Sequence, residues 1–391
     1  MTRSGWLFAA ACLPLLYIVV ELAARWWIRR ADQYFVLPPG LRLRLEIDAE
    51  TFPQLERSTR FDVNSCGERG DELPGSREGL YRVLVAGGSQ PEGFLLDQNS
   101  TWPGALHRLL EAPDVTARLG ASKVHVGCIA RSGVGSEALD LMFDRVLPRY
   151  PRLQLIVIMI GATDVMRWLE HGAAASLPPV RIPDIFRCHP LGPFGWRPKD
   201  LAAWELLLRA RRRWLRPTLV HERAGRWYAD ARAMRARATE IRHDMPDPTP
   251  MLERFDFHFR RVLARAAAHA DRVIVVRQPW FDKEYTSEEA AHMWHGGAGQ
   301  AWRENVTSYY SFDVVSRLMA CVDQRAESIA EELNVEQVDL MPILERSLAT
   351  YYDGFHATSN GARVVAAEIA AAIQRAPAEN RSLPCVDLLA S

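Results

Sequence analysis

The chain has 391 residues, and its 48 Lys and Arg residues balance 48 Asp and Glu residues, so the formal net charge at pH 7 is zero. Hydrophobic residues make up 48% of the sequence, which excludes a disordered or purely fibrous protein. The zero charge gives no general argument for nucleic-acid binding. The six cysteines form no CxxC pair and have no metal-ligand spacing to histidine, so we expect neither a disulfide scaffold nor a metal site.

The N-terminal segment is strongly apolar. Fifteen residues without a charge run from Trp6 to Val20, and tolerating Glu21 extends the run to Arg25. This length is close to the roughly 20 residues that cross the hydrocarbon as a helix. Trp26 and Trp27 follow, as in an interfacial belt. We therefore expect an N-terminal transmembrane helix over residues 1–30, with a cleaved signal peptide or a buried core helix as the alternatives.

The charges that flank this segment bear on its orientation. Arg25, Arg29 and Arg30 on its C-terminal side outnumber Arg3 and the terminal amine on the other. Taken alone, the positive-inside rule would put the main domain in the cytoplasm.

The rest of the chain alternates between strands and helices. Residues 31–80 are rich in Pro, Gly and charge, which predicts a linker and surface loops. Short apolar runs, typical of buried strands, then occur at residues 81–86, 123–128, 153–160, 272–276 and 336–340. Helical stretches separate them, so we predict an α/β domain over residues 81–377 with a parallel five-stranded sheet covered on both faces, and a tail over 378–391.

About 110 residues separate the third and fourth of these strands, far more than one crossover needs. We predict a helical insertion at about residues 166–250 that caps the cleft. One of its helices has Leu201, Trp204, Leu208 and Leu215 on a shared face. The insertion also holds eleven arginines between residues 209 and 242. A solvated hairpin is one interpretation, and contact with anionic lipid head groups or an acidic substrate is the other.

Three residues carry the chemistry of nucleophilic catalysis. Ser89 follows Gly87 and Gly88 at the end of a predicted strand, where a serine hydroxyl can be a nucleophile, although such a turn could equally bind phosphate. Far downstream, Asp353 and His356 stand three residues apart just before the last helix. They supply the base and the orienting carboxylate that a nucleophilic serine needs.

These blocks resemble those of the SGNH (GDSL-type) hydrolase superfamily, from about residue 64 to the last helix. Two further segments, NSCGERGDE at residues 64–72 and QNSTWPGALHRLL at residues 98–110, resemble its bacterial membrane-anchored branch. The resemblance implies a flavodoxin-like doubly wound fold (the SGNH hydrolase fold), with Ser89, His356 and Asp353 as catalytic residues and the Ser89 and Gly133 amides in the oxyanion hole. The third block of the family, Gly-x-Asn-Asp, corresponds to residues 161–164. Here Thr163 replaces the usual Asn, so a hydroxyl would replace an amide donor.

The resemblance implies a serine esterase or acyl hydrolase that needs no cofactor and acts on an ester such as an O-acetylated glycan or lipid. The alternatives are an acyltransferase, or a catalytically weakened domain that serves as a binding or assembly subunit in envelope polysaccharide or lipid modification. Anchored relatives imply a single-pass protein of the inner (cell) membrane with its catalytic domain in the periplasm. No motif places His258, His292 or His295, which we interpret as structural or substrate-side residues rather than metal ligands.

Overall fold

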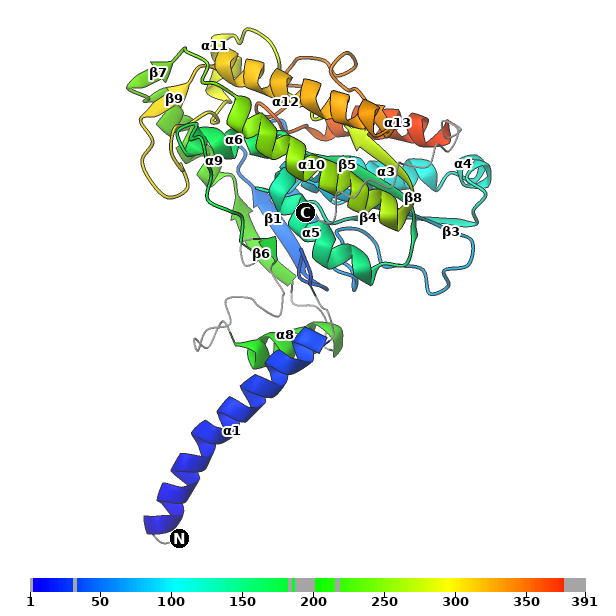
Figure 1. Cartoon of the computed structure of the whole chain (residues 1–391), viewed down its shortest axis with the longest axis vertical. Helices are drawn as coiled ribbons and strands as arrows, with labels where there is room; N and C mark the ends of the chain where they lie inside the picture. The colour runs from blue at the N-terminus through cyan, green and yellow to red at the C-terminus, as the bar shows by residue number, and fades with distance from the viewer. Residues whose placement is uncertain (1–2, 31–33, 182–184, 187–200, 215–218, 376–391) are drawn as a thin grey trace.

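The computed structural model describes residues 3–30, 34–181, 185–186, 201–214 and 219–375. The predicted C-terminal tail, 378–391, lies outside these residues. The chain forms an α/β domain with a long N-terminal helix that projects from it (Figure 1).

The centre of the domain is a five-stranded parallel sheet. Its strands are β3 (Leu80–Gly87), β4 (Lys123–Cys128), β5 (Leu153–Met159), β8 (Ala270–Val276) and β10 (Glu336–Val338). All five coincide with the predicted apolar runs, because strands buried on both faces need a nearly continuous apolar sequence. Their spatial order is β10-β8-β5-β3-β4, the flavodoxin-like order in which β3 and β5 lie on either side of the topological switch point.

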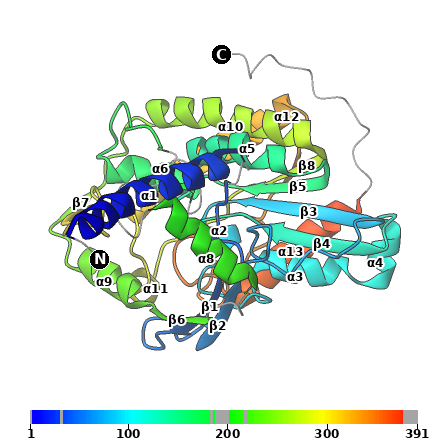
Figure 2. The ribbon, with the colours of Figure 1, turned by 90° about the horizontal axis from the view of Figure 1, so that it is seen from below.

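Helices cover both faces of this sheet, as predicted (Figure 2). One layer contains α5 (Ser136–Val146), α6 (Ala162–Glu170), α10 (Thr249–His269) and α12 (Phe312–Glu332). The other contains α3 (Trp102–Leu110) and α13 (Ser359–Gln374), which pack against each other. The shorter helices are α2 (Ser89–Glu92), α4 (Pro113–Arg118), the 3-10 turn Leu147–Arg149 and α11 (Ser287–Ala291).

A second, smaller sheet forms within the segment expected to be linker and loops. It consists of β2 (Ser58–Asp62), β1 (Arg42–Ile47) and β6 (Leu219–Ala224), in that order. Alternate residues of β1 are buried, as a strand with one face on a core requires. Its parallel partner β6 belongs to the insertion. Residues 34–80 therefore belong to the folded domain and are more than a linker with surface loops.

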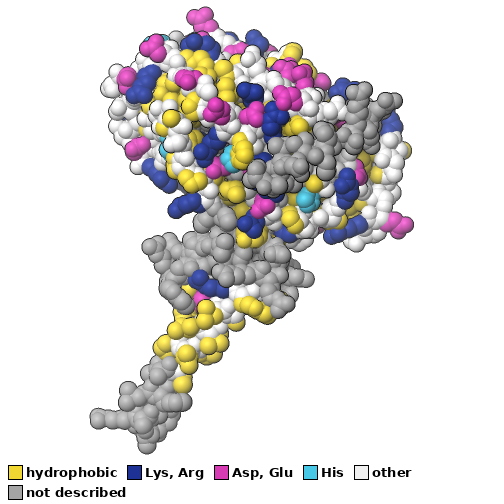
Figure 3. Space-filling model, in the orientation of Figure 1, with side chains coloured by type: hydrophobic (Ala, Val, Ile, Leu, Met, Phe, Trp, Pro, Cys, Tyr) yellow, Lys and Arg dark blue, Asp and Glu magenta, His cyan; other side chains and the backbone are white. Residues whose placement is uncertain are grey.

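The N-terminal segment forms the helix α1 (Arg3–Arg30). The residues between Leu13 and Trp27 expose many large apolar side chains (Figure 3). Six of the fifteen residues of the uncharged run, residues 6–11, lie outside the described side chains. Among the side chains that are described, no helix has both the length and the apolarity needed to cross a membrane.

The insertion contains α8 (Ala202–Trp214), α9 (Arg226–Ala236), β6 and the short strand β7 (Glu240–Arg242), which pairs with β9 (Ser308–Tyr310). The apolar face predicted for α8 does not cover the cleft. Instead α8 packs on α1, where the buried Glu21 carboxylate accepts hydrogen bonds from the Ala202 and Ala203 amides, both at 3.0 Å. Trp204 is 46% exposed, and Leu215 lies outside the described residues.

Candidate active site

Ser89 lies at the carboxyl end of β3, next to the switch point of the sheet. It begins α2, and its side chain is only partly buried. The turn before it depends on glycine: a Cβ on Gly87, whose φ is +153°, would lie 2.0 Å from the Met159 carbonyl oxygen. Because glycine has no Cβ, the ends of β3 and β5 can lie this close together at Gly87 and Met159. Ser89 is thereby presented at the edge where open α/β sheets bind ligands.

His356 reaches Ser89 from the loop that precedes α13. Its Nε2 lies 2.7 Å from the Ser89 Oγ, although 267 residues separate the two in sequence. The ring is buried and stacks on Tyr352 at a centroid distance of 5.3 Å and an interplanar angle of 7°. Thr358 caps the following helix by accepting a hydrogen bond from the Gly361 amide, so the loop is fixed at its C-terminal side.

Asp353 lies on the opposite side of the imidazole. Each of its carboxylate oxygens is 2.8 Å from the His356 Nδ1. Oδ1 also accepts hydrogen bonds from the Phe355 and His356 amides, and Oδ2 accepts one from the Trp294 indole at 2.9 Å. Burial opposes the carboxylate charge, yet His356 and these donors hold the pKa of Asp353 below its usual range. The carboxylate is therefore ionised and fixed in orientation.

Gly133 lies in the loop between β4 and α5, with φ at +80° in the left-handed region. Two carboxylates hold this loop. Glu92, from the last position of α2, accepts hydrogen bonds from the Ser132 hydroxyl and, at 2.7 Å, from the Ser132 amide. Asp164, from α6, accepts the Ser136 amide at 3.0 Å and the Ser136 hydroxyl at 2.6 Å. The exposed Gly133 is thus held between the segments that carry Ser89 and Thr163.

Both carboxylates are buried in a way that disfavours their charge. Burial raises the pKa of Glu92, while the Ser132 hydrogen bonds and nearby Arg69 oppose the rise. Burial likewise raises the pKa of Asp164, against the hydrogen bonds from Ser136. The hydrogen bonds from Ser132 and Ser136 therefore stabilise the charged forms of the two carboxylates that hold the loop.

Thr163 lies in the first turn of α6, and its Oγ1 is 3.6 Å from the position that a Cβ on Gly88 would take. It lines a cavity of about 820 Å³ together with Gly133. Trp302, Arg303 and Arg254 also line this cavity. The structure thus brings Gly133 and Thr163 to one cavity beside the switch point.

Arg69, in the segment between β2 and β3, supports the nucleophile turn. The Arg69 guanidinium, fully buried, donates hydrogen bonds to the carbonyl oxygens of Glu92, Gly93 and Leu96. It also donates to Gln98 Oε1 at 3.1 Å. Burial lowers the pKa of Arg69 to about 10.

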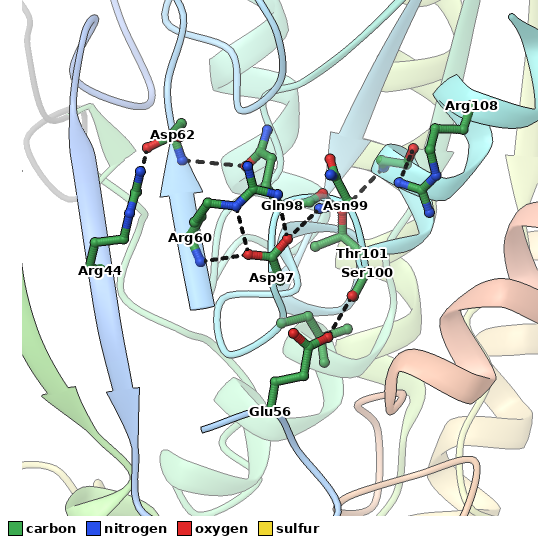
Figure 4. A network of polar contacts seen from close by, with 12 residues as sticks. Arg44, Glu56, Arg60, Asp62, Asp97, Gln98, Asn99, Ser100, Thr101 and Arg108 are labelled. Carbon is green, nitrogen blue, oxygen red and sulfur yellow. Dashed lines mark hydrogen bonds and ion pairs between the residues drawn. The ribbon is translucent and has the colours of Figure 1, made fainter. Parts of the chain in front are cut away.

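A second contact in the same region joins β2 to the loop after α2. Arg60 forms a two-pronged ion pair with Asp97 (Figure 4). The N-terminal sheet therefore braces the segment that carries Ser89.

The three histidines outside the motifs have structural surroundings. His258 contacts Asp140 at 3.1 Å, and the buried His295 packs on Phe355 with a ring separation of 4.6 Å. Burial lowers the pKa of His295 to about 3 and also lowers that of His292. In the described part of the chain, no three His, Cys, Asp or Glu side chains gather so as to hold a metal ion.

Sequence reasoning missed two residues that contact the predicted site, Glu92 and Trp294. Glu92 stands three positions after Ser89, so helical spacing could have put it beside the nucleophile turn. Trp294 is 59 residues from Asp353 in sequence, and no local pattern links the two.

Comparison with known proteins gives one family match. Residues 204–371, somewhat less than half of the chain, match the family model described as "SGNH domain (fused to AT3 domains)". The matched range includes Asp353 and His356. A search of curated proteins gives no match.

Two solved structures illustrate the structural similarity. Axe2, an acetylxylan esterase from Geobacillus stearothermophilus, has 13% identity and a TM-score of 0.40, covering 77% of this chain and 97% of its own. LAE5, an alpha/beta hydrolase from the metagenome of Lake Arreo, has 14% identity and a TM-score of 0.38, covering 75% and 94%. Scores this low say nothing about what this chain acts on. The family match, read with the sequence blocks that meet at the switch point, identifies the chain as a member of the SGNH hydrolase superfamily.

Proposed function

We propose that this chain is a serine ester hydrolase that works through an acyl-enzyme. The observation that carries the proposal is the continuous contact from Ser89 through His356 to an ionised Asp353. A nucleophile, a base and an orienting carboxylate within hydrogen-bond reach are what acyl transfer to serine requires. Backbone hydrogen bonds from Phe355 and His356 to Asp353 Oδ1 fix the carboxylate in this geometry.

The chemistry follows from the positions of these atoms. His356 Nε2 takes the proton of Ser89 as Oγ bonds to the acyl carbon of the ester, and the same nitrogen then returns the proton to the leaving alcohol as the C–O bond breaks. Water attacks the acyl-enzyme in the same way and releases the acid. Asp353 keeps its charge and stabilises the imidazolium in both halves.

The oxyanion of each tetrahedral intermediate needs hydrogen-bond donors that are already in place. We assign this role to the backbone amides of Ser89 and Gly133, with the Thr163 hydroxyl as the third donor. The support is that Gly133 and Thr163 line one cavity, and that Glu92 and Asp164 fix the Gly133 loop from both sides.

For the substrate, we propose an ester of a glycan or lipid that reaches the 820 Å³ cavity beside Gly133 and Thr163. We further propose that α1 anchors the chain in the inner membrane, with the domain on the periplasmic side. The exposed apolar side chains of α1 support the anchor, and family resemblance alone supports the side. A C-terminal fusion to alkaline phosphatase should be active, whereas a fluorescent reporter that matures only in the cytoplasm should be dark.

A second candidate rests on Thr163. Losing an oxyanion donor lowers turnover by about 10²–10³, so a Thr in place of Asn also fits a weakened domain that binds or assembles, or one that transfers acyl groups to an acceptor other than water. A fluorophosphonate probe separates an activated serine from an inert one, because only the former is phosphonylated.

The test of the proposed function uses that probe and acyl esters of different chain length, including acetylated glycans. The wild type should label and hydrolyse. Ser89→Ala should lose both activities, and His356→Ala should lose nearly all of both, while Asp353→Asn should keep a reduced remainder because the three residues act as a unit. Wild-type turnover in Ser89→Ala would refute the assignment of the nucleophile.

A further inference from the structure

The Asp353 carboxylate has a side-chain donor besides His356. The indole Nε1 of Trp294 lies 2.9 Å from Oδ2, while the Phe355 and His356 amides both bind Oδ1. The two oxygens are therefore held from different sides. Without the indole, the backbone amides would still fix Oδ1, but Oδ2 would keep only its contact with the imidazole.

Trp294 is itself held by α9, a helix of the insertion. The Trp227 ring packs edge-on against it with centroids 5.0 Å apart and an interplanar angle of 73°. The Tyr228 ring approaches at 6.0 Å and 83°. Such edge-to-face pairs fix the orientation of an aromatic ring as well as its depth.

Arg232, one turn further along α9, joins the two loops of the site. It donates hydrogen bonds to the carbonyl oxygens of His292 and Tyr352, both at 3.0 Å. His292 lies two residues before Trp294, and Tyr352 directly precedes Asp353. One helix of the insertion thus sets the position of both the indole and the carboxylate that it binds.

We propose that Trp294 is a positioning residue for the catalytic carboxylate, held in place by Trp227 and Tyr228 of α9. The inference rests on the proposed function, because it assigns a part in the same catalytic unit. Trp294 touches no reacting atom. It fixes Asp353 in the orientation that keeps His356 directed at Ser89, and it moderates how strongly the carboxylate attracts the imidazole proton.

Loss of the indole N–H has two consequences. Oδ2 is freer to move, so the imidazole is less well directed, and the reaction at Ser89 slows. The carboxylate also becomes a stronger acceptor for its remaining donors, which favours the protonated imidazole. Because only the neutral imidazole can accept the serine proton, the acid limb of the pH–rate profile moves to higher pH.

The other ionisable groups that face Asp353 stay unchanged in this comparison: Tyr228, Arg232, Tyr285, His292, His295 and Tyr352. A shift of the acid limb is therefore attributable to the indole. A merely structural role for Trp294 would lower the yield or the melting temperature of the protein without moving that limb.

The experiment measures the rate of Ser89 labelling by a fluorophosphonate across pH, which needs no knowledge of the substrate. Trp294→Phe keeps an aromatic ring and removes the donor. It should label about tenfold more slowly, the effect of one hydrogen bond to a charged group. Its acid limb should lie at higher pH than that of the wild type.

Two further variants separate donor loss from misfolding. The benzothienyl analogue of tryptophan, in which sulfur replaces the N–H group, keeps the shape at position 294 and should reproduce the slower rate and the shift. Trp280→Phe is the matched control, since its indole also donates a 2.9 Å hydrogen bond, to the Ser316 hydroxyl. It should label at the wild-type rate with an unchanged profile.

The outcomes distinguish this inference from the function on which it rests. If the wild type does not label at Ser89, the proposed function fails, and the role of Trp294 fails with it. If the wild type labels and both position-294 variants match it in rate and pH profile, only the role of Trp294 is refuted.

Discussion

Glu92→Gln should slow catalysis without unfolding the protein, because Glu92 holds the loop that carries Gly133. Its carboxylate accepts hydrogen bonds from both the amide and the hydroxyl of Ser132, the residue before Gly133. Glutamine keeps the length and one oxygen acceptor but loses the charge. The difference between a charged and a neutral hydrogen bond is about 1–1.5 kcal/mol, so kcat should fall about five- to tenfold.

Two comparisons sharpen this expectation. Glu92→Ala removes both bonds, and its loss of kcat should be larger while staying within the roughly 10²–10³ of a missing oxyanion donor. The stability of Glu92→Gln should change little, because burial already disfavours the Glu92 charge, as the raised pKa of the carboxyl indicates. KM should stay nearly constant, since the oxyanion contact forms mainly in the transition state.

The assay measures kcat and KM on one acyl ester, together with thermal unfolding. Glu336→Gln serves as the control, because Glu336 pairs with Arg272 at 2.6 Å at the opposite end of the sheet. It should alter the melting temperature at most, and leave kcat unchanged. Wild-type kcat in both Glu92 variants would show that the Ser132 contacts do not position the oxyanion loop.

Three more predictions test neighbouring parts of the structure. Thr163→Val should lower kcat with little change in KM, whereas an unchanged kcat would show that the hydroxyl is no oxyanion donor. Gly133→Ala should lower kcat without a packing clash, because no atom lies within 4 Å of the added Cβ and only the φ of +80° resists the change. Burial raises the pKa of Glu170 to about 8, so its contribution to stability is present below 4.5 and is lost as the pH rises through 8. Melting curves should show the wild type losing stability relative to Glu170→Gln across that range, and parallel curves would contradict the raised pKa.

Local patterns account for what could be predicted from the sequence. Four of the five central strands, β3, β4, β5 and β8, are mainly apolar runs, and a strand buried on both faces leaves that signature in the sequence. Ser89 and the Asp353–His356 pair were identifiable for a similar reason, because each stands at a strand or helix end where turn residues gather. Their assembly across 267 residues follows from the sheet order, which the family resemblance implied.

The features that could not be predicted from the sequence depend on contacts between distant segments, which leave no local pattern. The strand β1 was missed because its parallel partner β6 lies in the insertion, and its own alternation is only six residues long. The packing of α8 was wrongly predicted, since its apolar face fits a catalytic domain and the helix α1 equally well. Trp294 was missed, because nothing near it in sequence indicates a carboxylate partner.

The insertion contacts both the N-terminal helix α1 and the candidate active site, and it does so through different helices. At one end, Glu21 of α1 binds the first amides of α8, where a carboxylate is favoured both by the unpaired N–H groups and by the helix dipole. On its other side, α9 packs its aromatic side chains on Trp294, whose indole donates a hydrogen bond to the Asp353 carboxylate. A charge inside an otherwise apolar helix is costly in a membrane unless it is paired. Glu21 is paired here, because Arg25 of α1 forms an ion pair with it at 2.7 Å and the first amides of α8 donate to it. If α1 is the anchor that we propose, Glu21 would tie it to the insertion at α8, and the insertion in turn reaches Asp353 through Trp294.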